Sequence, residues 1–175
     1  MILPFSTEMN GKPTHFIDKI WSGLIYKKLS TIRICRDFER QRALITPSQF
    51  GVVPYHHPKL HTIREDKNNR WKVGTKIDFF INARQKNMFR FAPVLPVVST
   101  QVFEINWHSS NEKLFVRVYI DGKSFARIDF DKELYVSGQM LDFVNSDGFD
   151  TIEDFFDYFD KDYVGKIIHW TDLEY

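Results

Sequence analysis

Two runs of alternating apolar and polar residues, separated by Asp121-Gly122, constrain the fold of this 175-residue chain more than any other feature. A period of two is typical of strands with one buried face, and Asp-Gly is typical of the turn of a β-hairpin. A two-residue turn would place charged residues opposite apolar ones, whereas a loop one residue longer places Val118 opposite Ala126 and keeps one face apolar. Because a buried face fixes the register, we predict a hairpin over residues 114–130 with a longer loop or a bulge near Lys123.

Hydrophobic periodicity predicts further strands and several short helices. Apolar residues three and four apart predict a helix that Thr14 caps and that carries Lys19 on a polar flank. The basic segment 25–44 has an ambiguous period that fits a helix moderately, and the prolines of 46–58 predict a loop. Strands are predicted at 61–64, 76–81, 97–107 and 164–170, and helices at 133–144 and 151–159, the last capped by Asp150 or Thr151.

The composition is that of a folded chain rich in sheet. Hydrophobic residues make up 43% of the sequence and aromatic residues 16%. This apolar surface is enough to offset the entropy of ordering, which excludes a mainly disordered protein, and aromatic residues favour strands. The length suits one domain with its own core. We therefore predict a single α+β domain built on a small mixed β-barrel with short peripheral helices.

A net charge of +1 conceals a division between the two halves of the chain. Residues 1–90 contain seventeen Lys and Arg against seven Asp and Glu, whereas residues 91–175 contain seven against sixteen. Such a division indicates either an interaction surface or two halves that are interleaved in the fold and neutralise each other. A nearly neutral total charge argues against a basic surface over the whole protein that would bind long polyanions. It is compatible with a local basic pocket.

One stretch carries a resemblance to a known family. It begins with Lys59-Leu60-His61-Thr62-Ile63-Arg64 and continues, after a polar turn, with Lys72-Val73-Gly74 and a hydrophobic strand. This pattern resembles the ASCH domains, relatives of the PUA-like RNA-binding barrels, and the likeness extends to Asp147-Gly148-Phe149 and the closing strand. The resemblance implies a PUA-like barrel over residues 1–175, with an extended segment at about 26–56 and an added hairpin at about 114–130.

The residues of this stretch also have a chemistry of their own. Thr62 and Arg64 face the same side of a strand that begins near His61, and Lys59 lies in the loop before it. The planar guanidinium of Arg64 can bind phosphate or carboxylate through two hydrogen bonds. The ammonium of Lys59 supplies a localised positive charge, and the pKa of Lys59 falls if the group is desolvated near other cations. Thr62 can position a substrate, or act as a nucleophile where a base lies within reach. A purely structural interpretation also fits, with an Arg64–Asp147 ion pair, Thr62 as a strand residue and Asp147 as a turn residue.

The leading function is binding of RNA or of a nucleotide-derived ligand in a basic cleft around Lys59, Thr62 and Arg64. Trp71 can stack on an unpaired base while neighbouring cations hold the backbone, although packing inside the barrel is the alternative for this ring. The predicted ligand-binding residues are Lys59, Thr62, Arg64, Trp71, Lys72 and Lys19.

The resemblance implies an enzymatic alternative. One branch of the family consists of small amidohydrolases that cleave the amide of acetylcytidine with a Lys, a Thr and a Glu. Lys59 and Thr62 match the first two residues, and Asp147 lies near the position of the Glu. Two departures stand against this match: Asp is one methylene shorter than Glu, and Leu60 replaces a second Thr that the enzymes favour. A third possibility is a protein-interaction module formed by the added hairpin and the acidic half.

No metal site and no cofactor is predicted. His56-His57 and His61 invite a zinc interpretation, but without a cysteine pair or a spaced carboxylate set we interpret them as loop histidines. The sequence contains no Gly-rich phosphate loop. The oligomeric state is left open.

The single cysteine, Cys35, cannot form an internal disulfide, which favours a reducing compartment. The chain does not open with a basic segment followed by an apolar stretch, and no apolar run approaches the ~20 residues that span a bilayer. We therefore expect a cytoplasmic protein with no membrane partner.

Overall fold

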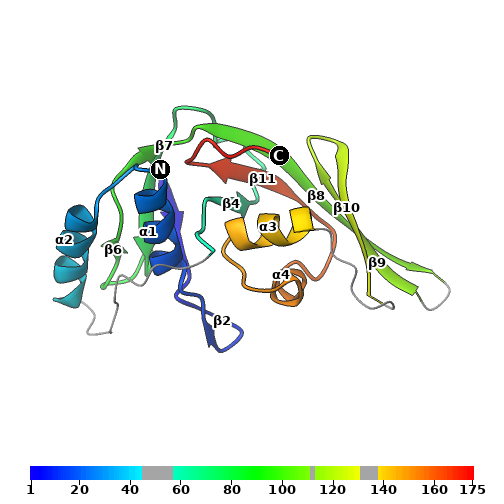
Figure 1. Ribbon diagram of the computed structural model, residues 1–175, viewed down its shortest axis with the longest axis horizontal. Coiled ribbons are helices and arrows are strands. Elements are labelled where there is room, and N and C mark those ends of the chain that lie inside the picture. Colours follow the sequence, from blue (N-terminus) through cyan, green and yellow to red (C-terminus); the bar gives the residue numbers. More distant parts are fainter. Residues whose placement is uncertain (45–56, 111–112, 131–137) are drawn as a thin grey trace.

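The computed structural model describes residues 1–44, 57–110, 113–130 and 138–175 (Figure 1). Within these ranges the chain forms two β-sheets, a short two-stranded ribbon and four helices, so the predicted α+β class is confirmed. None of these helices is long and apolar enough to cross a membrane. The helices are α1 (Phe16–Tyr26), α2 (Ile32–Ala43), α3 (Gly138–Ser146) and α4 (Ile152–Tyr158).

The larger sheet is antiparallel and has the strand order β10-β9-β8-β11-β4. Helices α3 and α4 cover one of its faces (Figure 1). Its strands are β4 (His61–Arg64), β8 (Ser99–Ser110), β9 (Lys113–Ile120), β10 (Lys123–Asp129) and β11 (Tyr163–His169).

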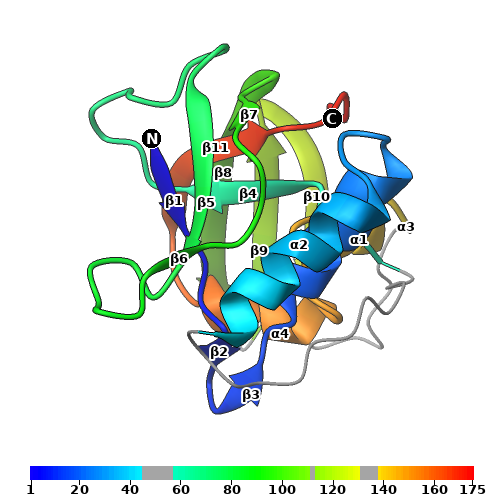
Figure 2. The same ribbon diagram turned by 90° about the vertical axis from the view of Figure 1, so that its left-hand side faces the viewer.

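The smaller sheet is built around β5 (Lys76–Ile81). Strand β1 (Ile2–Pro4) pairs with β5 in parallel, and β6 (Phe89–Arg90) and β7 (Leu95–Pro96) pair with it antiparallel. Helices α1 and α2 lie along this side of the molecule (Figure 2). The separate ribbon consists of β2 (Glu8–Met9) and β3 (Lys12–Pro13).

The described strands do not close into the predicted barrel. On one side the two sheets are continuous, because β7 leads directly into β8 and the N–H of Val98 donates to the carbonyl of His169. On the other side β1 and β4 are the edge strands of their sheets, and a side chain spans the gap: the Arg64 guanidinium donates to the Pro4 carbonyl at 2.6 Å. Within the described ranges β1 and β4 are therefore joined by this side-chain hydrogen bond and not by backbone pairing, and the arrangement of strands is open.

The hairpin has the predicted register. Ala126 lies opposite Val118, as an apolar face requires, and the register shifts between Ser124 and Ala126. The turn keeps two residues, Asp121-Gly122, both with positive φ, which is typical of a type I′ turn. The extra residue is therefore accommodated by a bulge at Phe125, which confirms the bulge and not the longer loop.

The helices differ from the predictions mainly at their ends. Helix α1 has His15 as its cap residue, with a left-handed φ of 53°, so the prediction that Thr14 caps it is wrong. The Thr151 hydroxyl caps α4 by accepting the Asp154 N–H at 3.1 Å, as predicted. The ambiguous basic segment forms α2. Most of the loop predicted at 46–58, and the start of the helix predicted at 133–144, lie outside the described residues.

Aromatic rings fill two core clusters. One cluster lies between the smaller sheet and α1 and contains Phe79 and Trp170, with ring centroids 5.2 Å apart. The other lies between the larger sheet and helices α3 and α4, where the rings of Phe103 and Phe143 stack with centroids 5.4 Å apart. Strand β4 lies between these clusters, which places the residues that follow Lys59 at their junction.

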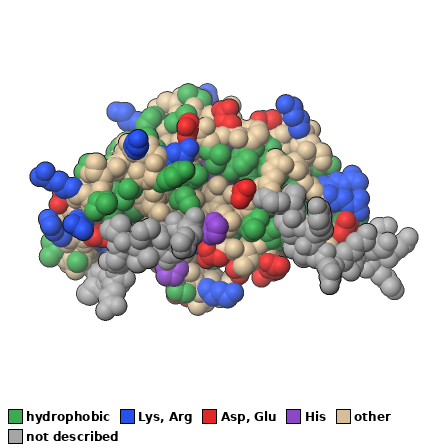
Figure 3. Space-filling model, viewed as in Figure 1, with side chains coloured by type: hydrophobic (Ala, Val, Ile, Leu, Met, Phe, Trp, Pro, Cys, Tyr) green, Lys and Arg blue, Asp and Glu red, His purple; other side chains and the backbone are tan. Residues whose placement is uncertain are grey.

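Ion pairs join the basic half of the chain to the acidic half. Figure 3 shows Lys and Arg side chains close to Asp and Glu side chains on the visible face. This favours interleaved, mutually neutralising halves as the explanation of the charge division. The pairs are Lys12–Asp154, Lys19–Asp150, Lys27–Asp172, Lys59–Asp147 and Lys166–Asp66.

Candidate functional site

The loop before β4 places Lys59 against Asp147. Lys59 Nζ lies 3.0 Å from Asp147 Oδ1 and also donates to the carbonyl of Asp147. The same Oδ1 accepts the N–H of Ile63 at 3.1 Å. Lys59 is 1% exposed and Asp147 is 4% exposed. Two of the three predicted catalytic residues therefore form a buried ion pair, and this pair replaces the Arg64–Asp147 pair of the structural interpretation.

Neighbouring residues hold this pair in place. Lys59 Nζ lies 4.7 Å from the centroid of the Phe16 ring, a cation–π contact. Gly148 has a φ of 93°, and a Cβ at this position would lie 2.9 Å from Lys59 Cδ and 3.0 Å from Phe16. Glycine is therefore required next to Asp147, both for the backbone conformation and for the close approach of the lysine.

Burial shifts the pKa of both partners. Desolvation lowers the pKa of Lys59 to about 8, although the Asp147 carboxylate opposes this shift. Desolvation also raises the pKa of Asp147 above its ordinary value, against the opposing effect of Lys59. A lysine with a pKa near 8 exchanges its proton near neutral pH much more readily than an exposed one. The pair therefore has the acid–base character that proton transfer needs.

Thr62 and Arg64 point away from the face that carries Ile63, as the strand alternation predicts. Thr62 is buried and lies opposite Ile168 of the first core cluster. No hydrogen bond joins its hydroxyl to Lys59 or to another described residue. The third predicted catalytic residue is therefore near the pair along the chain but not joined to it.

Arg64 lines a cavity of about 660 Å³ at the gap between β1 and β4. Its Nε is buried and has no hydrogen-bond partner among the described residues, while its terminal nitrogen donates to Pro4. Arg70 and Arg84 also line this cavity, and Glu65 contributes one carboxylate. The lining is therefore basic. Apolar walls come from residues that include Leu3, Trp71 and Met88.

The sequence places Arg70 beside Trp71 as a cation that could hold a nucleic-acid backbone, but it does not put Arg70 among the predicted ligand-binding residues and does not indicate Arg84. Arg84 lies in the loop between β5 and β6, where its φ is 68°. The excess of basic residues in the first 90 positions is the signal that includes both arginines. This excess does not distinguish Arg70 and Arg84 from cations elsewhere on the surface. The two arginines line one cavity only because separate segments of the chain fold against β1.

Trp71 and Lys72 lie in different surroundings, and only Trp71 borders the cavity of Arg64. Trp71 is 5% exposed and belongs to the first core cluster, so its ring packs inside the fold. Its N–H donates to Asp66 and its carbonyl accepts from Lys166. Lys72 is exposed in the turn before β5 and lines neither of the cavities described. The packing alternative for Trp71 is therefore the one observed.

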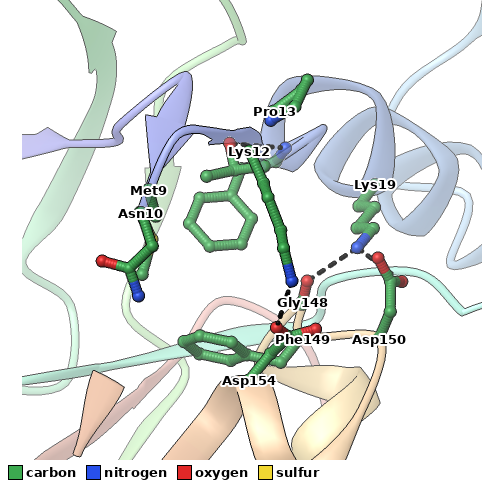
Figure 4. Close-up of a pocket in the computed structure, with 11 residues that line it drawn as sticks. Met9, Asn10, Lys12, Pro13, Lys19, Gly148, Phe149, Asp150 and Asp154 are labelled. Atoms are coloured by element: carbon green, nitrogen blue, oxygen red, sulfur yellow. Dashed lines mark hydrogen bonds and ion pairs between the residues drawn. The ribbon is translucent and has the colours of Figure 1, made fainter. Parts of the chain in front are cut away.

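Lys19 borders a smaller cavity of about 100 Å³, shown in Figure 4. Its Nζ donates to the Gly148 carbonyl at 2.8 Å and to Asp150 Oδ1 at 2.7 Å. The residue is 1% exposed, so its predicted place on a polar flank is wrong. Lys12 and Asp154, which also line this cavity, form a second ion pair at 3.2 Å. Both lysines of this cavity are therefore paired with carboxylates. The predicted ligand-binding residues do not form one basic cleft, because Lys19 and Arg64 line two different cavities.

Two buried histidines lie behind the Lys59–Asp147 pair. The ring centroids of His61 and His169 are 5.4 Å apart. Among the described side chains, no group of three His, Cys, Asp or Glu is arranged to hold a metal ion. His57 is exposed, and His56 lies outside the described residues.

The predicted residues thus come together in two arrangements, a buried Lys59–Asp147 pair and a basic cavity at Arg64. Comparisons with protein-family models, with curated proteins and with solved structures found no match to this chain.

Proposed function

We propose that this chain binds RNA or a nucleotide-derived ligand in the cavity of Arg64. The observation that carries the proposal is a cavity of about 660 Å³ in which Arg64, Arg70 and Arg84 meet apolar walls. Its volume falls within the range of roughly 300–1,000 Å³ that is usual for small-molecule sites. Guanidinium groups bind phosphate oxygens in a planar, bidentate manner, and apolar walls suit the rings of a nucleotide.

The open arrangement of sheets supports a finer proposal about the fold. We infer an open, PUA-like arrangement of the ASCH type in which a side chain bridges the junction between β1 and β4. The continuity of β7 with β8 supplies the opposite junction. Arg64, which belongs to the stretch that resembles the ASCH domains, both bridges the open junction and lines the cavity there.

Calorimetric titration of the full chain with cytidine monophosphate and with cytidine tests the proposed binding. We expect the monophosphate to bind more tightly, and Arg70→Ser or Arg84→Ser to weaken its binding roughly tenfold or more, because each removes a charge-assisted hydrogen bond. Raising the salt concentration should weaken binding further. Arg36→Ser, which removes an exposed arginine of α2, is the matched control and should leave the affinity unchanged.

Two results would overturn this proposal. One is equal affinity for cytidine and its monophosphate, which would show that the arginines do not contact the phosphate. The other is an unchanged affinity in both cavity variants.

A second function, hydrolysis of an N-acyl group on a modified nucleoside, is supported by one specific observation. Lys59, with a pKa of about 8, contacts a buried carboxylate. In this reaction water adds to the acyl carbon, the carbon–nitrogen bond breaks, and the leaving amine takes a proton. Acetylcytidine would thus give cytidine and acetate. Neither of the two cavities is lined by Lys59, Thr62 or Asp147, which ranks this function below ligand binding.

Chromatography of acetylcytidine incubated with the full chain tests this second function. If it is correct, the parent releases cytidine, and Thr62→Val lowers the rate by roughly a hundredfold or more, the usual scale for loss of a group in acid–base catalysis. Thr62→Val keeps the shape of the buried side chain, so it is preferred to changes of the ion pair. Thr75→Val, at a threonine in the turn before β5, is the control. Absence of turnover by the parent would exclude this substrate and leave binding as the function.

A further inference from the structure

One face of the β9–β10 hairpin carries a cluster of cationic and aromatic side chains. Strand alternation directs these side chains away from α3 and α4, which cover the other face of the sheet (Figure 1). Lys and Arg side chains gather at this end of the molecule in Figure 3. We name the cluster the hairpin face. Its residues are Phe115, Arg117, Tyr119 and Arg127 of the hairpin and His108 of the neighbouring strand β8.

Two arginines of the hairpin face stand directly opposite each other. Arg117 of β9 pairs with Arg127 of β10, and both are exposed. Like charges in directly opposed positions of a sheet repel and destabilise the strand pair. Asp129 lies 2.9 Å from Arg127, but Arg117 has no carboxylate partner among the described residues. An anion bound between the two arginines would relieve this repulsion.

The aromatic residues give the hairpin face flat surfaces. The rings of Phe115 and His108 stack with centroids 4.8 Å apart. The guanidinium carbon of Arg127 lies 4.2 Å from the centroid of the Phe115 ring, and that of Arg117 lies 5.6 Å away. Guanidinium planes and aromatic rings are the surfaces on which unpaired bases stack, while the positive charge holds the phosphates. The cluster thus combines both requirements of a single-strand binder.

We propose that the hairpin face binds a single strand of RNA whose other end occupies the cavity of Arg64, an inference that rests on the proposed function. Arg64 lies opposite Lys166 of β11, which lies opposite Val102 of β8, so the face is continuous with the cavity edge. Arg117 lies about 20 Å from Arg64 on standard sheet dimensions, too far for one nucleotide to reach both. The ligand is therefore a strand of several nucleotides. Glu104 interrupts the positive charge between the two places, so phosphate contacts are confined to the two arginine groups.

Fluorescence anisotropy of the full chain with labelled oligouridylate of about ten nucleotides, a length within the range of single-strand sites, tests this inference. Competition by uridine monophosphate provides the comparison. The oligonucleotide should bind at least roughly tenfold more tightly than the monophosphate, and the Arg117→Ser, Arg127→Ser double variant should remove this advantage. Its logarithmic salt dependence should also become shallower by about one or more. Monophosphate binding by this variant should be unchanged, and the Arg33→Ser, Arg36→Ser double variant, at two exposed arginines of α2, is the charge-matched control.

The outcomes separate this inference from the proposed function. An oligonucleotide affinity that the double variant leaves unchanged would overturn the inference alone. Oligonucleotide binding that depends on the hairpin arginines but not on Arg70, without any binding of the monophosphate, would overturn the cavity function and retain the hairpin site. If polyglutamate binds through the hairpin arginines and the oligonucleotide does not, the face takes an acidic protein and the inference is wrong.

Discussion

Replacement of Asp147 by Ala is expected to lower the free energy of unfolding by about 3–5 kcal/mol, the usual cost of removing one partner of a buried ion pair. Lys59 would lose the carboxylate that offsets its desolvation, in a site from which water is excluded. It would either carry an uncompensated charge beside Phe16 and the main-chain carbonyl of position 147 or release its proton, and both states cost free energy. The substitution also deprives the Ile63 N–H of its acceptor on the edge strand β4. Urea denaturation of the variant and the parent near neutral pH measures the difference.

Two further variants separate the charge from the hydrogen bond. Asp147→Asn keeps an oxygen that can accept the Ile63 N–H, so it should cost less than Asp147→Ala. Asp37→Ala is the control, because it breaks an Arg40–Asp37 pair on α2 whose side chains are 77% and 50% exposed. Exposed pairs contribute at most about 1 kcal/mol, so this variant should remain close to the parent. A cost for Asp147→Ala no larger than that of the control would show that the buried pair does not stabilise the fold.

The sequence predicts this fold best where a buried face restricts the choices. The register of the hairpin follows from the need to align Val118 with Ala126, and the structure has this register. Strand β4 has the predicted bounds, and its residues His61, Thr62 and Ile63 are buried between the two core clusters. Helix α4 begins directly after its cap residue Thr151, whose hydroxyl accepts the N–H of Asp154. In each case the interaction that fixes the element lies within a few residues or in one strand pair.

Features that depend on distant segments could not be predicted in the same way. Lys19 lies on α1 at a position that suits a polar flank, but its charge is satisfied by Gly148 and Asp150, more than 120 positions away. Arg70 and Arg84 are also separated along the chain, so their presence in the lining of one cavity could not be predicted from the sequence. Only the resemblance to the ASCH pattern placed Lys59 and Asp147 in one predicted site. The local sequence around Lys59 does not indicate Asp147, and the local sequence around Asp147 does not indicate Lys59.

Acidification is expected to destabilise the folded chain through two buried histidines. Burial depresses the pKa of His61 well below its ordinary value and that of His169 to about 4. In the unfolded chain a histidine titrates near pH 6.5, so below this pH the unfolded state binds protons that the folded state does not. The stabilising contribution is therefore complete above pH 6.5 and is lost as the pH falls toward the folded pKa values. The slope approaches about 1.4 kcal/mol per pH unit for each histidine.

Asp18 acts in the opposite direction over part of this range. Burial raises its pKa from 3.8 to about 6, so its folded state binds a proton more readily than its unfolded state. This carboxyl therefore adds stability as the pH falls from about 6 toward 3.8. A comparison between the parent and a histidine variant removes this contribution, because both proteins share it.

His169→Leu isolates the contribution of one histidine. Neither ring nitrogen of His169 has a hydrogen-bond partner among the described residues, so an apolar side chain of similar size leaves no polar group unpaired. By urea denaturation we expect the variant to match or exceed the parent at about pH 7.5, and its advantage to grow by about 2 kcal/mol at about pH 5. His57→Asn, at an exposed histidine, should follow the parent at both pH values. If His169→Leu also followed the parent between these pH values, His169 would not be the group whose protonation unfolds the chain, and the acid sensitivity would have to come from His61 alone.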